Sequence, residues 1–556
     1  MQLRLKRLSP HTQEALVTAP KLSRTSQLNY VIWALIGLGI FFRLFHFFDN
    51  RSMFINGIYL SSSLVRMNFL ELATLPLDYE QKAPIGYLWM VKLTVLLFGK
   101  SEMVLRIFPL LCGIAAVFVF LPVCRYFLKP VGVVIAMGIM TLAPPLIYHT
   151  VEEKQYITEL LATILVLYLY IRYHKKSTIS DLVMWGFWGA VIVWFSYSSI
   201  FILAGMAFAI GLSYIFNKNW PALFRSMIPF GMWLISFAVN FFFFTYKHAD
   251  SEWLVTWFIM RGSFMPLPPA SLSELKWFSK TIRELLGWPL GLLIYYDLPG
   301  TPRLLSLTKQ LLPLLCSALG LLMFFRQDKK VFMMLLFPIL LTLLASGLKQ
   351  YPFFERLIVF LVPLFILFIA RGGDKIASIL PAVGRVRYIV PLLLLAWPLW
   401  SSAKEVFNPD LFGGRYKSYH REAFNYINDH FQKGDVVYVY WNTKPIYRFY
   451  KEIYGFKFDP IEGRDVRYAS HNFDEYFQNL QPDLAALAGK KRVWFIYNKS
   501  YFHKIGEFDG QPAWYYAEQQ RSGKLFHDKV ASMGKVIQTY EKPHINFSLL
   551  DLSNAK

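Results

Sequence analysis

The chain has 556 residues, of which 55% are hydrophobic, 18% aromatic and only 17% charged. This apolar share exceeds that of an ordinary soluble domain and indicates a polytopic membrane protein. The formal net charge is +22, but Lys and Arg fall in short clusters between apolar runs, as in cytoplasmic loops, so they indicate contact with anionic membrane lipids and argue against nucleic acid as a partner. The three cysteines show no paired spacing, which argues against a disulfide framework and against a cysteine metal site.

Residues 1–27 are polar and basic, and the apolar run behind them, 28–48, is too long for a signal-peptide core. We expect a cytoplasmic N-terminal segment followed by a retained first helix. Ten further apolar stretches bring the prediction to about eleven transmembrane helices: 102–127, 131–150, 156–173, 182–198, 199–216, 227–246, 304–325, 331–348, 357–370 and 388–400.

The orientation follows from the basic clusters in alternate connections, at 125–129, 172–176, 218–225, 326–330 and 371–387. The positive-inside rule places these clusters in the cytoplasm with the N-terminus. It therefore places the loop 49–100, the turn 151–155, the loop 247–303, the turn 349–356 and everything after residue 400 outside. We expect a multi-pass protein of the plasma (inner) membrane, with a transmembrane domain over 28–400.

After residue 400 the charges become dense and the apolar runs become short. The stretches GDVVYVYW (434–441) and KRVWFIYN (491–498) are typical of buried strands, and 418–435 has helical periodicity. Residues 401–556 therefore predict an extracytoplasmic α/β domain of ordinary size.

The exposed turns place ionisable groups at one membrane edge. The first loop carries Asp49, Asp78, Glu80 and Lys82, and the second and later turns carry further groups: Glu152, Glu153, Lys154 and Tyr156, then Tyr351 and Arg356. Cations gathered there could hold the phosphate of a lipid while its tail stays in the bilayer. The alternative is that these side chains are interfacial anchors, with Lys and Arg snorkelling and Tyr in an aromatic belt.

Four segments carry a family resemblance: DNRS in the first loop, then DYEQKAPIGYLWMVKLTVLLFGKSEMVLRIFPLLCG, LAPPLIYHTVEEKQY and YPFFERL. In order and spacing, residues 28–371 resemble the GT-C glycosyltransferases of the protein O-mannosyltransferase and aminoarabinose transferase type, including bacterial proteins similar to glycosyltransferase family 39. The resemblance implies a GT-C membrane fold. It also implies transfer of a sugar from a polyprenyl-phosphate donor to a lipid, protein or glycan acceptor outside the cytoplasm.

The resemblance assigns the donor phosphate to basic residues, for which Lys82, Lys154 and Arg356 are the matching candidates, with Tyr156 and Tyr351 beside them. Their role would be electrostatic stabilisation of the departing phosphate while the acceptor attacks the anomeric carbon directly.

The sequence departs from the family where an acidic pair, commonly Asp-Glu, is expected, because these positions hold Asn56 and Gly57. The first acid of the pair is taken as the base that activates the acceptor, and asparagine cannot accept that proton. Asp49, Asp78 or Glu153 could replace the acid, or the acceptor could need no strong base, since polyprenyl phosphate is a good leaving group. The chain could also be a non-catalytic relative that binds a lipid-linked glycan or an envelope partner, in which Asn56 could still orient a ligand.

No cofactor is required by the sequence, although a divalent metal is a possibility because some relatives bind one. Glu80, Glu152 and His248 are weak candidate ligands, with no diagnostic spacing. A transporter is disfavoured, because the chain shows no repeated half and few ionisable residues in mid-span.

Overall fold

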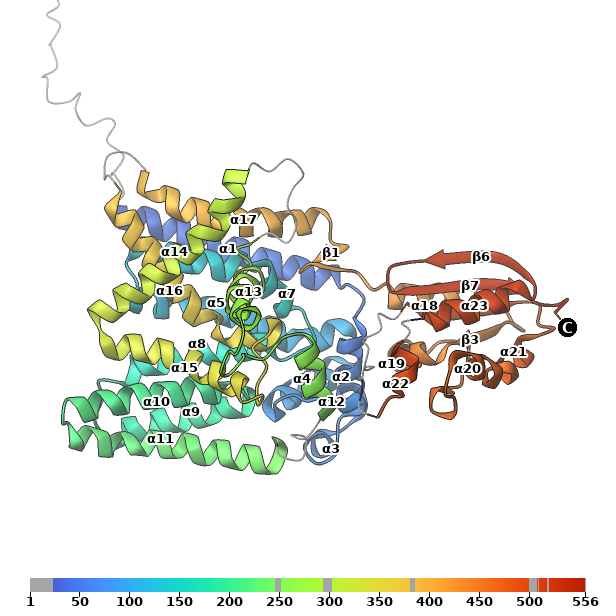
Figure 1. The fold of residues 1–556 in the computed structure, drawn as a ribbon, viewed down its shortest axis with the longest axis horizontal. Helices are drawn as coiled ribbons and strands as arrows, with labels where there is room; N and C mark the ends of the chain where they lie inside the picture. The colour runs from blue at the N-terminus through green and yellow to red at the C-terminus, as the bar shows by residue number, and fades with distance from the viewer. Residues whose placement is uncertain are drawn as a thin grey trace, which may run out of the picture.

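The computed structural model describes residues 24–245, 252–293, 303–380, 386–499, 508, 510–517 and 520–555. His248, a weak candidate metal ligand in the sequence analysis, lies outside these residues. The chain forms a large helical bundle at one end and a smaller domain with a β-sheet at the other, and the first loop lies where the two meet (Figure 1).

The bundle is built from long apolar helices. They are α1 (Arg24–Asp49), α5 (Glu102–Phe127), α6 (Pro130–Leu142), α7 (Pro144–Thr150), α8 (Tyr156–Tyr173), α9 (Ile179–Phe195), α10 (Ser199–Phe216), α11 (Trp220–Asn240), α14 (Arg303–Gln327), α15 (Lys329–Gly347), α16 (Val362–Ile379) and α17 (Ile389–Phe407). Two shorter helices, α12 (Glu252–Met260) and α13 (Leu272–Gly287), lie between α11 and α14.

Within the described residues, eight helices are long and apolar enough to cross a membrane, and the bent pair α6 and α7 makes a ninth span. The sequence predicts about eleven, and the difference lies in the predicted spans 182–198 and 304–325. These correspond to α9 and to the apolar part of α14, which pack along α11 and α16 but are shorter than a full span. The chain is therefore a multi-pass membrane protein, as predicted. One predicted helix differs, because 131–150 is broken rather than continuous.

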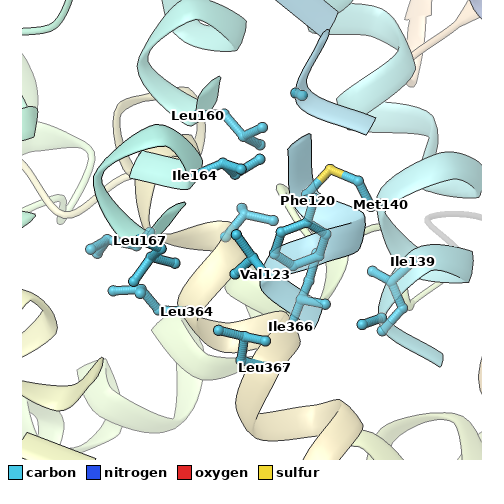
Figure 2. Close-up of a cluster of buried hydrophobic side chains, with 14 of the residues drawn as sticks. Phe120, Val123, Ile139, Met140, Leu160, Ile164, Leu167, Leu364, Ile366 and Leu367 are labelled. Carbon is cyan, nitrogen blue, oxygen red and sulfur yellow. The ribbon is translucent and has the colours of Figure 1, made fainter. Parts of the chain in front are cut away.

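The core of the bundle lies around α16, the most buried of these spans. Figure 2 shows the apolar side chains of α5, α6, α8 and α16 meeting there, among them Phe120, Met140, Ile164 and Leu367. Each of these four side chains is fully buried. Since lipid tails are as apolar as these side chains, close packing rather than exclusion from water holds such a core together.

The first loop is folded. It contains α2 (Ile55–Arg66), α3 (Phe69–Thr74), the short 3-10 turn η2 (Asp78–Glu80) and α4 (Ile85–Phe98). A capping box fixes the start of α3, in which the Asn68 side chain accepts from the Glu71 backbone N–H and the Glu71 side chain accepts from that of Asn68. The loop is therefore an ordered layer over one end of the bundle.

The C-terminal domain opens with a small hairpin, β1 (Leu411–Phe412) and β2 (Arg415–Tyr416), followed by a five-stranded sheet in the order β4-β3-β5-β7-β6. Strands β3 (Val436–Val439), β4 (Ile461–Glu462) and β5 (Val493–Asn498) are parallel, while β7 (Ile545–Asp551) is antiparallel to β5 and to β6 (Lys535–Glu541). The predicted strands within 434–441 and 491–498 are thus β3 and β5.

Helices cover both faces of this sheet. They are α18 (His420–His430), α19 (Lys444–Tyr454), α20 (Phe473–Asn479), α21 (Gln481–Leu487), α22 (Ala513–Ala517) and α23 (Ser522–Ser532). Val437 and Trp494 on one face belong to the same hydrophobic cluster as Ile58 and Leu88 of the first loop. The first loop is therefore packed into the core of the C-terminal domain as well as onto the bundle.

Candidate functional site

The break between α6 and α7 places a buried polar turn at the end of the bundle. Pro144 has no N–H to continue α6, and Ala143 before it is extended, with φ −65° and ψ 118°. The two helices bend by 52°. Gly113 of α5 allows the close approach of α7, because a Cβ there would lie 2.5 Å from the Thr150 hydroxyl oxygen. The turn 151–155 is consequently held between α5, the first loop and α8.

Three cations converge on this turn. Lys154, only 8% exposed, donates to the Gln81 side-chain oxygen at 2.6 Å. Arg356, from the turn before α16, lies over the ring of Tyr156 at 5.9 Å. Arg415, from the β1–β2 hairpin, lies over Tyr148 at 5.6 Å. Segments from four parts of the sequence thus build one cationic site.

The charges of this site are only partly balanced. Burial raises the pKa of Glu152, but the hydrogen bond from His149, at 2.7 Å, and the charges of Arg415 and Arg356 outweigh burial and leave that pKa below its usual value. The carboxylate is therefore ionised at neutral pH. Burial first, and then the charge of Arg356, lower the pKa of Lys154 to about 7. The site is short of negative charge, and an anion bound there would restore the proton to Lys154.

Glu153 lies on the other side of the turn, facing α5 and the first loop. Arg106 of α5 pairs with its carboxylate and also donates to the Asn50 side chain at 3.0 Å and to the Arg51 carbonyl at 2.8 Å. A Cβ on Gly57 would lie only 2.7 Å from the Glu153 Oε2 atom. The carboxylate therefore occupies the space that a side chain at position 57 would need. Burial raises the pKa of Glu153 above its usual value, although Arg106 opposes this.

The other candidate acids lie elsewhere. Asp78 accepts from the Ser63 hydroxyl at 3.1 Å and pairs with Arg66 at 2.5 Å. Both partners lie in α2, at least two turns beyond Asn56, so Asp78 ties η2 to that helix. Asp49, at the end of α1, lines a groove with Phe41, Phe45 and Phe48. Asn56 itself is exposed in the first turn of α2. Of the three predicted carboxylates, Glu153 is the one placed against the Asn56–Gly57 turn.

Of the other residues predicted to bind the donor phosphate, some lie beside Lys154 and Arg356 and others do not. Tyr156 is buried against Arg356 and His149. Tyr351 donates its hydroxyl to the Leu357 carbonyl at 2.7 Å and packs on Phe201. Lys82 is exposed, one residue after the Gln81 that binds Lys154. The structure therefore brings Lys154, Arg356 and Tyr156 together and leaves Lys82 at the rim.

The weak metal candidates do not meet. Across the described ranges, no three His, Cys, Asp or Glu side chains are grouped as metal ligands. Glu152 binds His149 instead, and Glu80 is exposed on η2.

Three residues of the site were not predicted from the sequence. Arg106 sits in an apolar helix, and Arg415 sits on a two-residue strand with no recognisable pattern. The third is Tyr87 of α4, which is fully buried and within electrostatic range of Glu152 and Glu153. Its hydroxyl has no hydrogen-bond partner among the residues that the structure describes. An unpartnered buried hydroxyl beside two carboxylates is costly, and a bound ligand would satisfy it.

The first loop is fastened to the C-terminal domain beside this site. Buried Glu102 accepts from the Met53 backbone N–H at 3.2 Å and the Tyr450 hydroxyl at 2.7 Å, and it pairs with Arg421. Arg421 also donates to the Asn50 carbonyl at 2.6 Å. The C-terminal domain thereby fixes the segment that leads into Asn56.

Comparisons with known proteins agree with this architecture. Residues 82–244 match the family model of dolichyl-phosphate-mannose-protein mannosyltransferases. No curated protein sequence matches the chain.

Among solved structures, the chain resembles ArnT from Cupriavidus metallidurans bound to undecaprenyl phosphate, with a TM-score of 0.54 and 10% identity over 96% of this chain and 100% of that chain. The apo state of the same protein gives a TM-score of 0.50 at 10% identity, over 94% and 98%. The Archaeoglobus fulgidus oligosaccharyltransferase tethered with an acceptor peptide gives 0.48 at 12% identity, over 94% and 73%. The fold of the chain and the match over residues 82–244 therefore agree with the predicted resemblance to GT-C glycosyltransferases.

Proposed function

We propose that this protein is a membrane glycosyltransferase, which takes a sugar from a polyprenyl-phosphate donor and transfers it to an acceptor on the extracytoplasmic face of the membrane. The observation that carries the proposal is the site around the turn 151–155, where Lys154, Arg356 and Arg415 surround one ionised carboxylate, Glu152. A lipid phosphate is the ligand that suits buried cations at the end of a transmembrane bundle.

The donor would place its phosphate against Lys154 and Arg356 and its chain along the bundle. Lys154 is buried and Arg356 is half-buried, so their attraction for a phosphate is stronger than that of surface lysines. ArnT, which has the same fold, was solved with undecaprenyl phosphate, and this supports the same class of donor here.

The transfer would be a single displacement at the anomeric carbon. The acceptor oxygen forms a bond to that carbon as the bond from carbon to the phosphate oxygen breaks. The electron pair passes to the phosphate, where Lys154 and Arg356 stabilise it. The acceptor proton passes to Glu153, whose raised pKa makes it a stronger base than an ordinary glutamate. Glu153 and Lys154 are consecutive residues, so the proposed base and the proposed phosphate-binding cation belong to the same turn.

The orientation follows from the charge pattern. The site and the C-terminal domain lie at the end of the bundle where α1 finishes (Figure 1). Basic residues such as Arg125, which donates to Asn29 near the start of α1, and Arg371, which donates to Gln327, lie at the opposite end. The positive-inside rule makes that end cytoplasmic, which supports an extracytoplasmic site in the plasma (inner) membrane.

Donor binding gives the test. Undecaprenyl phosphate is titrated into the purified protein in lipid nanodiscs. Replacing Lys154 or Arg356 with alanine removes a charge-assisted contact and should weaken binding by at least about tenfold. The matched control is Lys175→Ala, at an exposed position beyond the other end of α8. Equal affinity in all four proteins would refute the donor site.

One observation favours a second function. The ion pair with Arg106 neutralises the Glu153 charge, and Asn56 supplies no other base. The chain could therefore bind a lipid-linked glycan without transferring it. The Asn56→Asp variant distinguishes the two: no transfer by the wild-type protein but transfer by this variant would favour the binding protein. Loss of wild-type transfer on Glu153→Gln would favour the enzyme.

A further inference from the structure

A second pocket, separate from the cationic turn, lies between the C-terminal domain and the first loop. It has a volume of about 340 Å³ and is lined on one side by residues that follow β3, β4 and β5. Strand β3, the middle one of the three parallel strands, leads through α19 to β4 on one side, and the chain then crosses back to β5 on the other. The crevice at the carboxyl ends of parallel strands, where the strand order reverses in this way, is where open α/β sheets bind ligands.

The floor of this pocket is fixed in advance. The Asn442 side chain donates to the Asn498 carbonyl at 2.9 Å and accepts from the Asn498 N–H at 3.2 Å, which ties the loop after β3 to the end of β5. The guanidinium of Arg467 lies 3.6 Å from the centre of the Trp441 ring and is paired with Asp465 at 2.7 Å. A rigid floor of this kind lowers the entropic cost of binding a ligand.

The first loop supplies the opposite wall. Tyr59 of α2 and Tyr79 of η2 stack with ring centroids 4.4 Å apart. Tyr79 and Glu80 both have left-handed backbone conformations, with φ of 55° and 53°. Such conformations are strained in residues other than glycine and gather at binding sites. The strained turn holds the Tyr79 ring at the mouth of the pocket.

The rim carries unneutralised positive charge. Lys444 makes no ion pair with any residue that the structure describes and lies half-buried beside Arg448. Arg448 pairs with Glu462, while the Tyr468 ring beside them is 62% exposed. Aromatic faces pack against the apolar faces of sugar rings, and the cations select an acidic group. A neutral apolar ligand would leave Lys444 without a paired counter-charge.

We propose that this pocket binds the acceptor, and that the acceptor is a saccharide bearing an anionic group. Ile55 lines the pocket and lies two residues before Gly57, so a saccharide seated there reaches the first turn of α2, where Gly57 approaches the Glu153 carboxylate. The role as acceptor rests on the proposed function, whereas the binding of an acidic saccharide does not.

Binding is measured by isothermal titration calorimetry on the full-length protein in nanodiscs, without donor. The probes are tetragalacturonate, mannose 6-phosphate and neutral mannotetraose. We expect one of the acidic probes to bind at least tenfold more tightly than mannotetraose, and which one binds identifies carboxylate or phosphate as the anionic group. Equal or absent binding of all three would overturn the proposal.

Variants locate the binding. Lys444→Ala should weaken the acidic probe about tenfold, and Tyr468→Ala should weaken it about fivefold by removing the exposed ring. Lys535→Ala, on the strand β6 at the far edge of the sheet, is the matched control and should have no effect. Undecaprenyl phosphate should bind all three variants like wild type, which separates this pocket from the donor site. Unchanged probe affinity in both pocket variants, with normal thermal unfolding, would refute this location.

Discussion

Lys154 should make donor binding depend on pH in a way that surface lysines would not. Its pKa in the unoccupied protein is about 7, against an ordinary value of 10.5. At 1.4 kcal/mol per pH unit, burial and Arg356 together disfavour the charged form by roughly 5 kcal/mol. A bound phosphate favours the charged form, so Lys154 must take up a proton whenever the donor binds above pH 7.

The sign of the effect follows from this proton uptake. Affinity for undecaprenyl phosphate should fall as pH rises, by about fivefold between pH 7 and 8 and by about ninefold between pH 8 and 9. The phosphate loses its own second proton near pH 6, so the range from pH 7 to 9 reports the protein alone. The dissociation constant is measured by microscale thermophoresis in nanodiscs at several pH values and constant ionic strength.

The matched variant is Lys154→Arg, because a guanidinium stays charged throughout this range. Its affinity should be nearly constant from pH 7 to 9. A wild-type affinity that changes less than twofold over that range, or the same slope in the arginine variant, would refute the reasoning.

Three further variants probe the surroundings of the site. Gly57→Ala places a Cβ 2.7 Å from the Glu153 carboxylate that Arg106 holds, and it should lower the free energy of unfolding by about 1–3 kcal/mol, measured by thermal denaturation. In a Glu153→Ala background, where the carboxylate is absent, Gly57→Ala should cost less than in the wild-type protein, and an equal cost in both backgrounds would contradict the contact. Tyr87→Phe removes the costly unpartnered hydroxyl and should raise the unfolding temperature of the ligand-free protein, while reducing sugar transfer about tenfold; unchanged transfer would show that the hydroxyl meets no ligand. Arg421→Ala leaves buried Glu102 without its cation and should cost about 3 kcal/mol of stability, whereas Lys433→Ala on the surface should cost almost nothing.

The sequence predicts the bundle well because each span is a continuous apolar run bounded by charges, and it predicts the sheet because β3 and β5 are continuous apolar strands. The convergence of Lys154 with Arg356 is predictable too, since both follow from the topology. The break at Pro144 was not predicted, because residues 131–150 form one continuous apolar run. The adjacent residues Pro144 and Pro145 are the signal in the sequence that could have indicated it.

The rest of the site depends on contacts between distant segments. In the sequence, Arg106 is a single charged residue within an apolar helix. Its role could not be predicted, because its partner Glu153 lies 47 residues further along the chain. Arg415 lies on a strand too short to leave a pattern. The space beside Gly57 is filled by Glu153, and no local rule connects those two positions. Only the three-dimensional structure shows that the Glu153 carboxylate lies against Gly57 of α2.

The central claim is that the turn 151–155 and the turn before α16 hold a lipid phosphate, and a cryo-EM structure of the protein with undecaprenyl phosphate tests it most directly. The account predicts phosphate density within hydrogen-bonding distance, about 3 Å, of both the Lys154 ammonium and the Arg356 guanidinium. Phosphate density at another position, with the turn 151–155 unchanged and unoccupied, would contradict it.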